Sequence, residues 1–116
     1  MAKIARIYSF EAAHFLPHVP REHKCSRMHG HSYQVRVTLE GTINEKGWVL
    51  DFYDLDTVVN VLVGSLDHRC LNDLPGLDNP TAENIAMWFK NGLSKHFAPD
   101  PVTVRVYETR DSYAEV

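Results

Sequence analysis

The sequence lacks any long run of apolar residues and has only two cysteines among its 116 residues. A helix needs about 20 consecutive apolar residues to span a bilayer, so we expect no membrane partner. The first residues, Met1–Arg6, also lack the apolar stretch of an export signal. A chain of this length buries enough surface to fold without disulfides, and two cysteines suit a reducing compartment. We therefore expect a cytoplasmic protein with one domain over residues 1–116.

Positive charge is scarce as well. The chain has 12 Lys and Arg against 15 Asp and Glu, a formal net charge of −3 and a pI near 6.1. Proteins that bind nucleic acid through its phosphates usually present a strongly basic surface. The charge balance therefore argues against a nucleic-acid partner.

Histidine, in contrast, is abundant, with seven residues. His29 and His31 flank Gly30 just before residues 32–40, in which polar and apolar residues alternate as in a half-buried strand. Side chains at positions i and i+2 lie on the same face of a strand. Both histidines share the parity of the apolar positions, so we expect them to face the core, where they can bind one metal ion.

A third ligand is predicted at His14, the last residue of another alternating segment, residues 4–14. Two antiparallel strands would bring this histidine beside His29 and His31. Three imidazoles and an open position are typical of catalytic zinc, so we predict Zn²⁺, although iron, nickel and copper also accept imidazole ligands. Three other histidines are interpreted as ordinary surface residues: His18, His23 and His96.

A cysteine lies close to this cluster in the sequence. Cys25 belongs to residues 15–28, the long connection between the two strands. A divalent cation and nearby basic residues lower the pKa of a thiol and favour a thiolate that can take protons. Alternatively, Cys25 is the fourth ligand of a closed structural site. Three basic residues of the connection either clamp a phosphorylated substrate or are simply solvated: Arg21, Lys24 and Arg27.

The adjacent pair Asp67 and His68 is the candidate partner for this thiol. A carboxylate that orients an imidazole, which in turn exchanges a proton with a thiol, is a common arrangement in activated bases. Adjacent Asp and His residues also occur by chance, so the spacing alone is weak support. Cys70, two residues further on, is most simply a small buried apolar residue.

Two helices are predicted in the second half of the chain. Apolar residues recur at helical spacing after Asp54, a candidate N-cap, and Gly64 is the expected end of this helix. A second helix is predicted to open at residues 79–81, with Pro80 in its first turn.

Alternation predicts further strands at residues 102–109 and 113–116, and a short buried extended piece at residues 48–52. The element order is then β-β-α-α-β-β, an α+β fold with both helices on one face of a small antiparallel sheet. Glu108 shares the parity of the apolar residues of its strand. A carboxylate there is costly unless it is paired, so it lies either at a wet strand end, which the spacing slightly favours, or toward a ligand.

A sheet of three or four strands has open edges, and proteins normally cover such edges or pair them with another chain. Pairing between sister subunits would close them. We therefore predict a homo-oligomer.

Taken in order, six short motifs give the chain a resemblance to the 6-pyruvoyltetrahydropterin synthase family, and within it to the 6-carboxytetrahydropterin synthases of queuosine and other 7-deazapurine pathways. The likeness covers nearly the whole chain, and the motifs are weak singly but specific together. They are residues 10–14 (FEAAH), 25–31 (CSRMHGH), 47–52 (GWVLDF), 66–68 (LDH), 79–83 (NPTAE) and 108–109 (ET). Residues 110–113 depart from the pattern, because they lack the glycine- or cysteine-containing turn of bacterial members.

The resemblance implies the T-fold, in which subunits form a barrel with the helices outside. The usual assembly is a hexamer built as a dimer of trimers, with active sites at subunit interfaces. The resemblance also implies roles for the candidate residues: zinc ligands His14, His29 and His31, general base Cys25, proton relay Asp67 and His68, pterin-anchoring catalytic residue Glu108, and substrate contacts Lys24, Arg27, Thr81 and Glu83.

The family resemblance further implies a small-molecule substrate, 7,8-dihydroneopterin triphosphate or a related pterin. Three residues separate Cys25 from His29, a spacing that resembles the carboxytetrahydropterin type more than the animal pyruvoyl type. The expected activity is a carbon–carbon lyase that forms 6-carboxy-5,6,7,8-tetrahydropterin and releases acetaldehyde and triphosphate. The alternatives are a 6-pyruvoyltetrahydropterin synthase on the same scaffold and a non-catalytic, zinc-stabilised module that binds a pterin.

Overall fold

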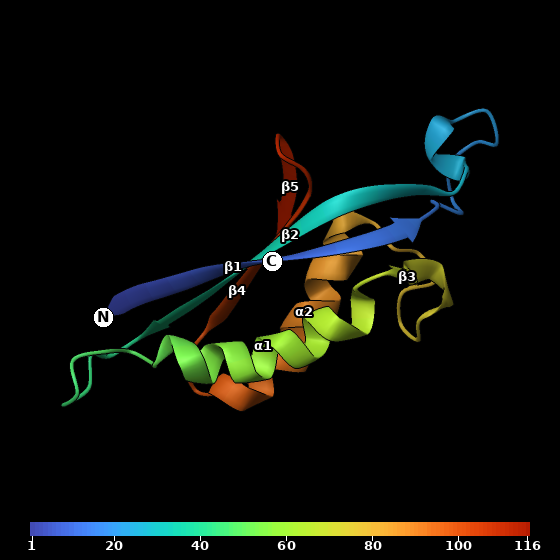
Figure 1. Cartoon of the computed structure of the whole chain (residues 1–116). Coiled ribbons are helices and arrows are strands. Elements are labelled where there is room, and N and C mark those ends of the chain that lie inside the picture. Colours follow the sequence, from blue (N-terminus) through green and yellow to red (C-terminus); the bar gives the residue numbers. More distant parts are fainter.

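Two long antiparallel strands dominate the computed structural model, which describes residues Met1–Val116 (Figure 1). They are β1 (Ala2–His14) and β2 (His29–Gly41), and their register is continuous over the whole length of both strands. Each strand has one apolar face, and a slip of one residue would turn that face to solvent, so the alternating pattern fixes the register. This register pairs His14 with His29.

Three shorter strands complete a mixed sheet in the order β3-β1-β2-β4-β5. Strand β4 (Val102–Thr109) pairs antiparallel with β2, and β5 (Ser112–Glu115) pairs antiparallel with β4. Strand β3 (Arg69–Cys70) is parallel to β1. The prediction of a purely antiparallel sheet of three or four strands was therefore wrong, because a two-residue strand is too short to show the alternation by which strands are found.

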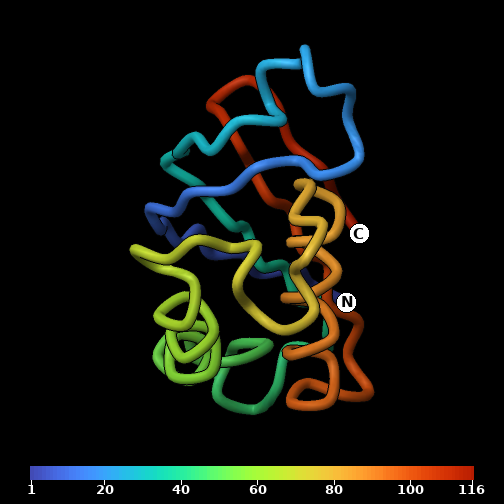
Figure 2. Tube along the Cα trace, turned by 90° about the vertical axis from the view of Figure 1, so that its right-hand side faces the viewer, coloured from blue at the N-terminus to red at the C-terminus, as the bar shows by residue number.

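Two helices cover one face of this sheet, as predicted. They are α1 (Phe52–Leu66) and α2 (Ala82–Phe97), and Figure 2 shows both on the same side of the strands. Their buried side chains pack with the apolar face of β1, β2 and β4 in a single core. Neither helix has the length and apolar character needed to cross a membrane. The helices contribute these buried residues to the core: Leu55, Val59, Val63, Leu66, Ile85, Ala86, Phe89 and Leu93.

The first helix begins earlier and ends later than the sequence predicted. Asp51, not Asp54, is its N-cap, since the Asp51 carboxylate accepts a hydrogen bond from the backbone N–H of Tyr53 at 2.9 Å. A glycine typically ends a helix by adopting a positive φ. Gly64 does not adopt one, so the helix continues for two more residues.

The buried extended piece predicted at residues 48–52 is also wrong. Residues 48–51 form a bend that leads into α1, which begins at Phe52, and Trp48 is 41% exposed. No strand of the sheet pairs with these residues, so the apolar run does not become a strand. The second helix opens close to the predicted place: Thr81 is its N-cap and accepts a hydrogen bond from the N–H of Asn84 at 3.1 Å. Pro80 precedes this cap instead of lying in the first turn.

The sheet has open edges. Strand β3 pairs only with Ala12 and Ala13, so most of the outer edge of β1 has no partner within the chain. Strand β5 forms the opposite edge. Edges of this length present unpaired backbone groups that proteins usually pair or cover. The open edges expected from the sequence are therefore present in the structure. That sister subunits close them in a homo-oligomer stays a prediction.

Candidate metal centre

Three histidines meet at one end of the β1–β2 pair. His14 is the last residue of β1 and lies opposite His29, the first residue of β2, while His31 lies two positions further along β2. One nitrogen from each ring lies within 4.8 Å of the other two. His14 is fully buried, and His29 and His31 are half-buried. The structure thus brings together the three residues that the sequence predicted as metal ligands.

Hydrogen bonds to the backbone fix which nitrogen faces the centre. Nδ1 of His14 lies 2.8 Å from the carbonyl oxygen of Pro80, and Nδ1 of His29 lies 2.7 Å from the carbonyl oxygen of Arg27. A carbonyl only accepts hydrogen bonds, so both Nδ1 atoms carry a proton. In neutral rings, both Nε2 atoms then present lone pairs, and these atoms lie 3.0 Å apart. Two lone pairs at this distance repel each other unless they share a cation.

A metal ion fits this centre better than a proton does. Desolvation by burial lowers the pKa of His14 and of His31, because it disfavours the charged ring. Nε2 of His31 is also buried without a hydrogen-bond partner. One divalent cation would use the Nε2 atoms of all three rings at once, and bonds from Nδ1 to a carbonyl are typical of metal-binding imidazoles. The identity of the metal, zinc by ligand type, stays a prediction.

Glu108 faces the same centre from β4. Its carboxylate oxygens lie 3.5 Å from Nε2 of His31 and 3.9 Å from Nε2 of His14. The side chain is 28% exposed, so Glu108 does not lie at the wet strand end that the spacing slightly favoured. The pairing of β4 with β5 is irregular between Tyr107 and Thr109. The carboxylate is directed toward the histidines, on the core face that its parity predicted, and its contact with a ligand stays a prediction.

Two cavities open beside the centre. The first has a volume of about 500 Å³ and is lined by His31, Tyr33 and Glu108, among other residues from the ends of β1, β2 and β4. The second has a volume of about 290 Å³ and joins Glu108 to Thr81 and Glu83 at the start of α2. The structure therefore places the predicted substrate contacts Thr81 and Glu83 in one cavity with the predicted pterin anchor.

The turn after α1 holds Asp67 and His68 in contact. The Asp67 carboxylate accepts a hydrogen bond from the backbone N–H of Glu11 at 2.9 Å and lies 3.1 Å from Nδ1 of His68. The bond from Glu11, followed by the contact with His68, lowers the pKa of Asp67 and keeps it ionised. His68 has a φ of 60°, which is uncommon for a residue other than glycine. The turn therefore presents an exposed imidazole beside a fixed carboxylate.

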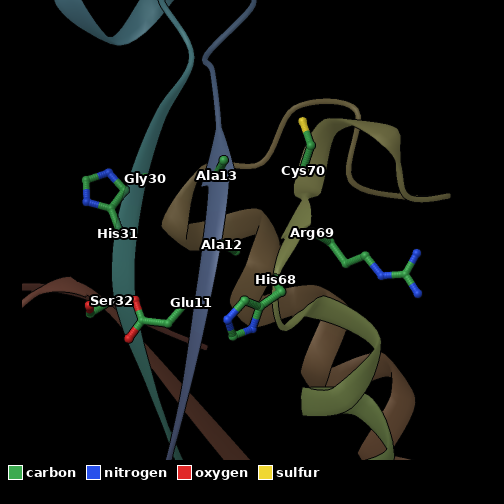
Figure 3. Close-up of a pocket in the computed structure, with 9 residues that line it drawn as sticks. All are labelled: Glu11, Ala12, Ala13, Gly30, His31, Ser32, His68, Arg69 and Cys70. Carbon is green, nitrogen blue, oxygen red and sulfur yellow. Dashed lines mark hydrogen bonds between the residues drawn. The ribbon is translucent and has the colours of Figure 1, made fainter.

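His68 and Glu11 point into a third cavity of about 540 Å³ (Figure 3). The lining of this cavity extends to Gly30 and His31 of β2, so His68 and the histidine centre lie against the same part of the sheet. Cys70 also lines this cavity and is half-buried. The prediction of a buried Cys70 therefore holds only in part, because this residue belongs to the edge strand β3 and not to the core.

Cys25 lies outside these three cavities within one chain. It is the middle residue of a short 3₁₀ turn, η1 (Lys24–Ser26), and is half-buried. Its backbone N–H donates a hydrogen bond to Nδ1 of His23 at 3.0 Å. The Cys25 thiol is not among the ligand atoms that gather at the centre, which argues against a closed site with a fourth, thiolate ligand. No hydrogen bond joins Cys25 to His68, so their predicted proton exchange stays a prediction.

The predicted phosphate contacts lie in the same connection. The side chains of Lys24 and Arg27 are exposed, as is that of Arg21, and none of them lines the three cavities. Arg27 instead supports the centre through its backbone carbonyl, which orients His29. A role of the three cations in binding phosphate stays a prediction.

Two residues of the site were missed by the sequence analysis. Tyr33 lines the cavity of Glu108, and its strand parity, which is that of His29 and His31, could have indicated this place. Glu11 was missed because its backbone contacts come from the turn at Asp67, which is distant in the sequence.

The geometry predicts that the histidines are needed for metal retention. We expect His31→Ala to lower the zinc content of the purified protein sharply, because two imidazoles alone bind zinc weakly, and His29→Ala should have the same effect. His96→Ala, which changes an exposed histidine of α2, is the control and should retain the metal. Elemental analysis measures the difference. Loss of zinc from Cys25→Ala would show a thiolate ligand and contradict the open site.

Comparison with known proteins identifies the family. The sequence profile of 6-pyruvoyl tetrahydropterin synthase matches residues 3–116. The 6-carboxy-5,6,7,8-tetrahydropterin synthase of Synechocystis sp. is 44% identical, and the match covers 96% of this chain and 89% of that protein. The dihydroneopterin monophosphate aldolase of Pyrococcus furiosus is 40% identical over 99 residues, which cover 85% of this chain and 81% of that protein.

A solved structure extends the likeness to the fold. The 6-pyruvoyl tetrahydropterin synthase of Caenorhabditis elegans superposes with a TM-score of 0.88 at 25% identity, and the match covers 99% of this chain and 94% of that one. The T-fold predicted from the sequence motifs is thereby confirmed. On its fold and on its sequence, the chain belongs to the 6-pyruvoyl tetrahydropterin synthase family.

Proposed function

We propose that this protein is a zinc-dependent lyase that converts 7,8-dihydroneopterin triphosphate to 6-carboxy-5,6,7,8-tetrahydropterin, with release of acetaldehyde and triphosphate. The observation that carries the proposal is the grouping of three histidines that could hold a metal with a carboxylate 3.5 Å from one of them, since His31 and Glu108 line the same cavity. The relative from Synechocystis sp. carries the name of this activity.

Glu108 is the residue best placed to hold the pterin ring. The ring has a guanidine-like edge of parallel N–H donors, and a carboxylate accepts such a pair through both oxygens. Thr81 and Glu83 line the adjoining cavity and would contact the same ring. Lys24 and Arg27 are the candidates for holding the triphosphate, because phosphate is bound by charge-assisted hydrogen bonds from such side chains.

The chemistry divides between the metal and two proton carriers. Zinc bound by the three histidines would polarise the side-chain oxygens of the substrate and acidify the neighbouring C–H bond. Cys25, as a thiolate, takes this proton. Cleavage of the carbon–carbon bond also needs a water molecule, whose oxygen becomes part of the new carboxylate, and a second proton exchange, for which His68 is the available group. Asp67, ionised and 3.1 Å from Nδ1 of His68, orients the imidazole for that exchange.

We further propose that the active site is completed between subunits. Cys25 does not line the cavity into which His68 points, and the open edges of the sheet offer a place for a second chain. A homohexamer built as a dimer of trimers, with residues 1–116 as a single catalytic domain in each subunit, would close the edges. A cytoplasmic location and a place in queuosine or another 7-deazapurine pathway belong to the same proposal.

The relatives define the rival activities. A 6-pyruvoyltetrahydropterin synthase would use the same centre to eliminate triphosphate without cleaving a carbon–carbon bond. The relative from Pyrococcus furiosus is named for an aldolase that acts on the monophosphate, so that ester must be tested as a substrate. A non-catalytic module that only binds a pterin would leave unexplained why Asp67 is held against His68.

The role of Glu108 predicts the effect of removing its charge. Glu108→Gln should weaken pterin binding by at least about tenfold, because a charge-assisted hydrogen bond is worth roughly 1.5 to 3 kcal/mol. Isothermal titration calorimetry of the zinc-loaded protein measures the change. Glu45→Gln, which alters an exposed carboxylate in the turn after β2, is the control. Equal affinity of Glu108→Gln and the unchanged protein would remove Glu108 from the pterin site.

The product decides between the activities. We expect turnover of dihydroneopterin triphosphate to yield 6-carboxytetrahydropterin and stoichiometric acetaldehyde, which chromatography and an assay coupled to alcohol dehydrogenase measure. His68→Ala should block turnover and keep the zinc, because the imidazole moves a proton and does not bind the metal. A pyruvoyl product without acetaldehyde would assign the chain to the other branch, and turnover of the monophosphate alone would favour the aldolase.

An interfacial site predicts that two inactive variants restore each other. Cys25→Ala and His68→Ala, co-expressed in equal amounts, should regain activity in about a quarter of the sites, since a site that takes Cys25 from one variant and His68 from the other is intact. Each variant alone is the control. A mixed assembly that stays inactive would place both residues of a site in one chain.

A further inference from the structure

Tyr33 lies against the metal centre and has a hydroxyl without a partner. Its side chain is fully buried, and its ring stacks on Phe10 at a centroid separation of 4.9 Å. The same ring meets His14 and His31 edge-on, at centroid separations of 5.8 and 5.4 Å. The hydroxyl is buried and makes no hydrogen bond within the chain. Buried hydroxyls are nearly always paired, so an unpaired one beside a binding cavity needs an explanation.

Glu108 shares a cavity with Tyr33. Both residues line the cavity of about 500 Å³ beside the histidines. A tyrosine hydroxyl can donate a hydrogen bond and a carboxylate can accept it, so the two side chains are complementary. Tyr8, the other tyrosine buried on the same face of the sheet, does have a hydrogen-bond partner. Its hydroxyl donates to the carboxylate of Asp56 at 2.7 Å.

The histidines donate no hydrogen bond to Glu108. Nε2 of His31 and Nε2 of His14 lie 3.5 and 3.9 Å from the carboxylate oxygens. Nε2 of His14 presents a lone pair, and Nε2 of His31 makes no hydrogen bond. A nitrogen that gives its lone pair to a metal also has no proton to donate from that atom. With a metal bound, the carboxylate therefore still needs a donor from elsewhere. The hydroxyl of Tyr33 is a buried and uncommitted donor in the same cavity.

We propose that Tyr33 is a positioning residue, whose hydroxyl donates a hydrogen bond to the Glu108 carboxylate when the histidines hold a metal ion. The inference rests on the proposed function, because it gives Tyr33 a part in binding the pterin ring that Glu108 anchors. A carboxylate offers about four lone-pair sites, so it can accept from Tyr33 and from the pterin edge together. The bond fixes the plane in which the two oxygens meet the ring.

The test uses a variant that removes only the oxygen atom. Tyr33→Phe keeps the stacked ring, and the zinc content of the variant should be unchanged. Calorimetry with 7,8-dihydroneopterin and zinc-loaded protein should show about fivefold weaker binding, the effect expected of one lost hydrogen bond. The metal-free variant should unfold at the same or a higher temperature, because it no longer buries an unpaired hydroxyl. A hydroxyl with a merely structural role would lower the unfolding temperature and leave the affinity unchanged, and that pair of results would overturn the proposal.

Tyr8→Phe is the matched control. It removes a buried tyrosine hydroxyl that does have a partner, Asp56, away from the histidines. It should lower the unfolding temperature and leave the affinity for 7,8-dihydroneopterin unchanged, which is the reverse of the pattern expected for Tyr33→Phe.

A double-mutant cycle separates this inference from the proposed function. In a Glu108→Ala background, Tyr33→Phe should cause no further loss of affinity, because the acceptor is already gone. Additive losses would overturn the bond between the two residues. If the unchanged protein fails to bind 7,8-dihydroneopterin, the proposed function and the inference are both overturned. If it binds and Tyr33→Phe binds equally well, only the role of Tyr33 is overturned.

Discussion

The centre of this structure is a contact that is unfavourable by itself. Nε2 of His14 and Nε2 of His29 face each other at 3.0 Å, and each ring is held in this orientation by a bond from its Nδ1 to a backbone carbonyl. The register of β1 and β2 places the two rings opposite each other. The carbonyls come from elsewhere, from the residue before the cap of α2 and from the connection that precedes β2. The fold therefore prepares two lone pairs for a cation before the cation arrives, which lowers the cost of ordering the ligands on binding.

The sequence allowed prediction of the parts of the site that depend on strand periodicity. His14, His29 and His31 could be grouped because two alternating segments and one antiparallel pairing suffice to bring them together. Strand parity placed Glu108 on the core face, but its surroundings could not be predicted, because the contacts with His14 and His31 come from other strands. The pairing of β3 with β1 could not be predicted either, because a strand of two residues is too short to show an alternation of polar and apolar positions. Sequence periodicity therefore does not predict features that depend on contacts between residues distant in the sequence.

Helix boundaries show the same limit on a smaller scale. Asp51 and Asp54 are both acceptable N-caps by residue type, and only the backbone geometry at Asp51 lets its carboxylate reach the N–H two residues ahead. The start of α2 was predicted more closely, because a proline and an acidic residue mark it, although Pro80 precedes the Thr81 cap instead of lying in the first turn. The difference has a functional consequence. The segment at Thr81 places the Pro80 carbonyl against His14 and the start of α2 in the cavity of Glu108, so the clearest helix signal in the chain belongs to the site.

The same acidic residue connects the metal to the pterin in the proposed activity. The carboxylate of Glu108 lies 3.5 and 3.9 Å from Nε2 of His31 and Nε2 of His14, two nitrogens that would bind a metal ion. Glu108 also lines both cavities beside the centre. A metal on the histidines would attract the negative charge of the carboxylate and hold Glu108 beside the centre, with its oxygens open to the ligand. If the metal favours the pterin in this way, the pterin must favour the metal by the same factor, because coupling between two binding events is reciprocal. The two functions of the site are therefore linked through one carboxylate, which the parity of β4 places on the same face of the sheet as the histidines.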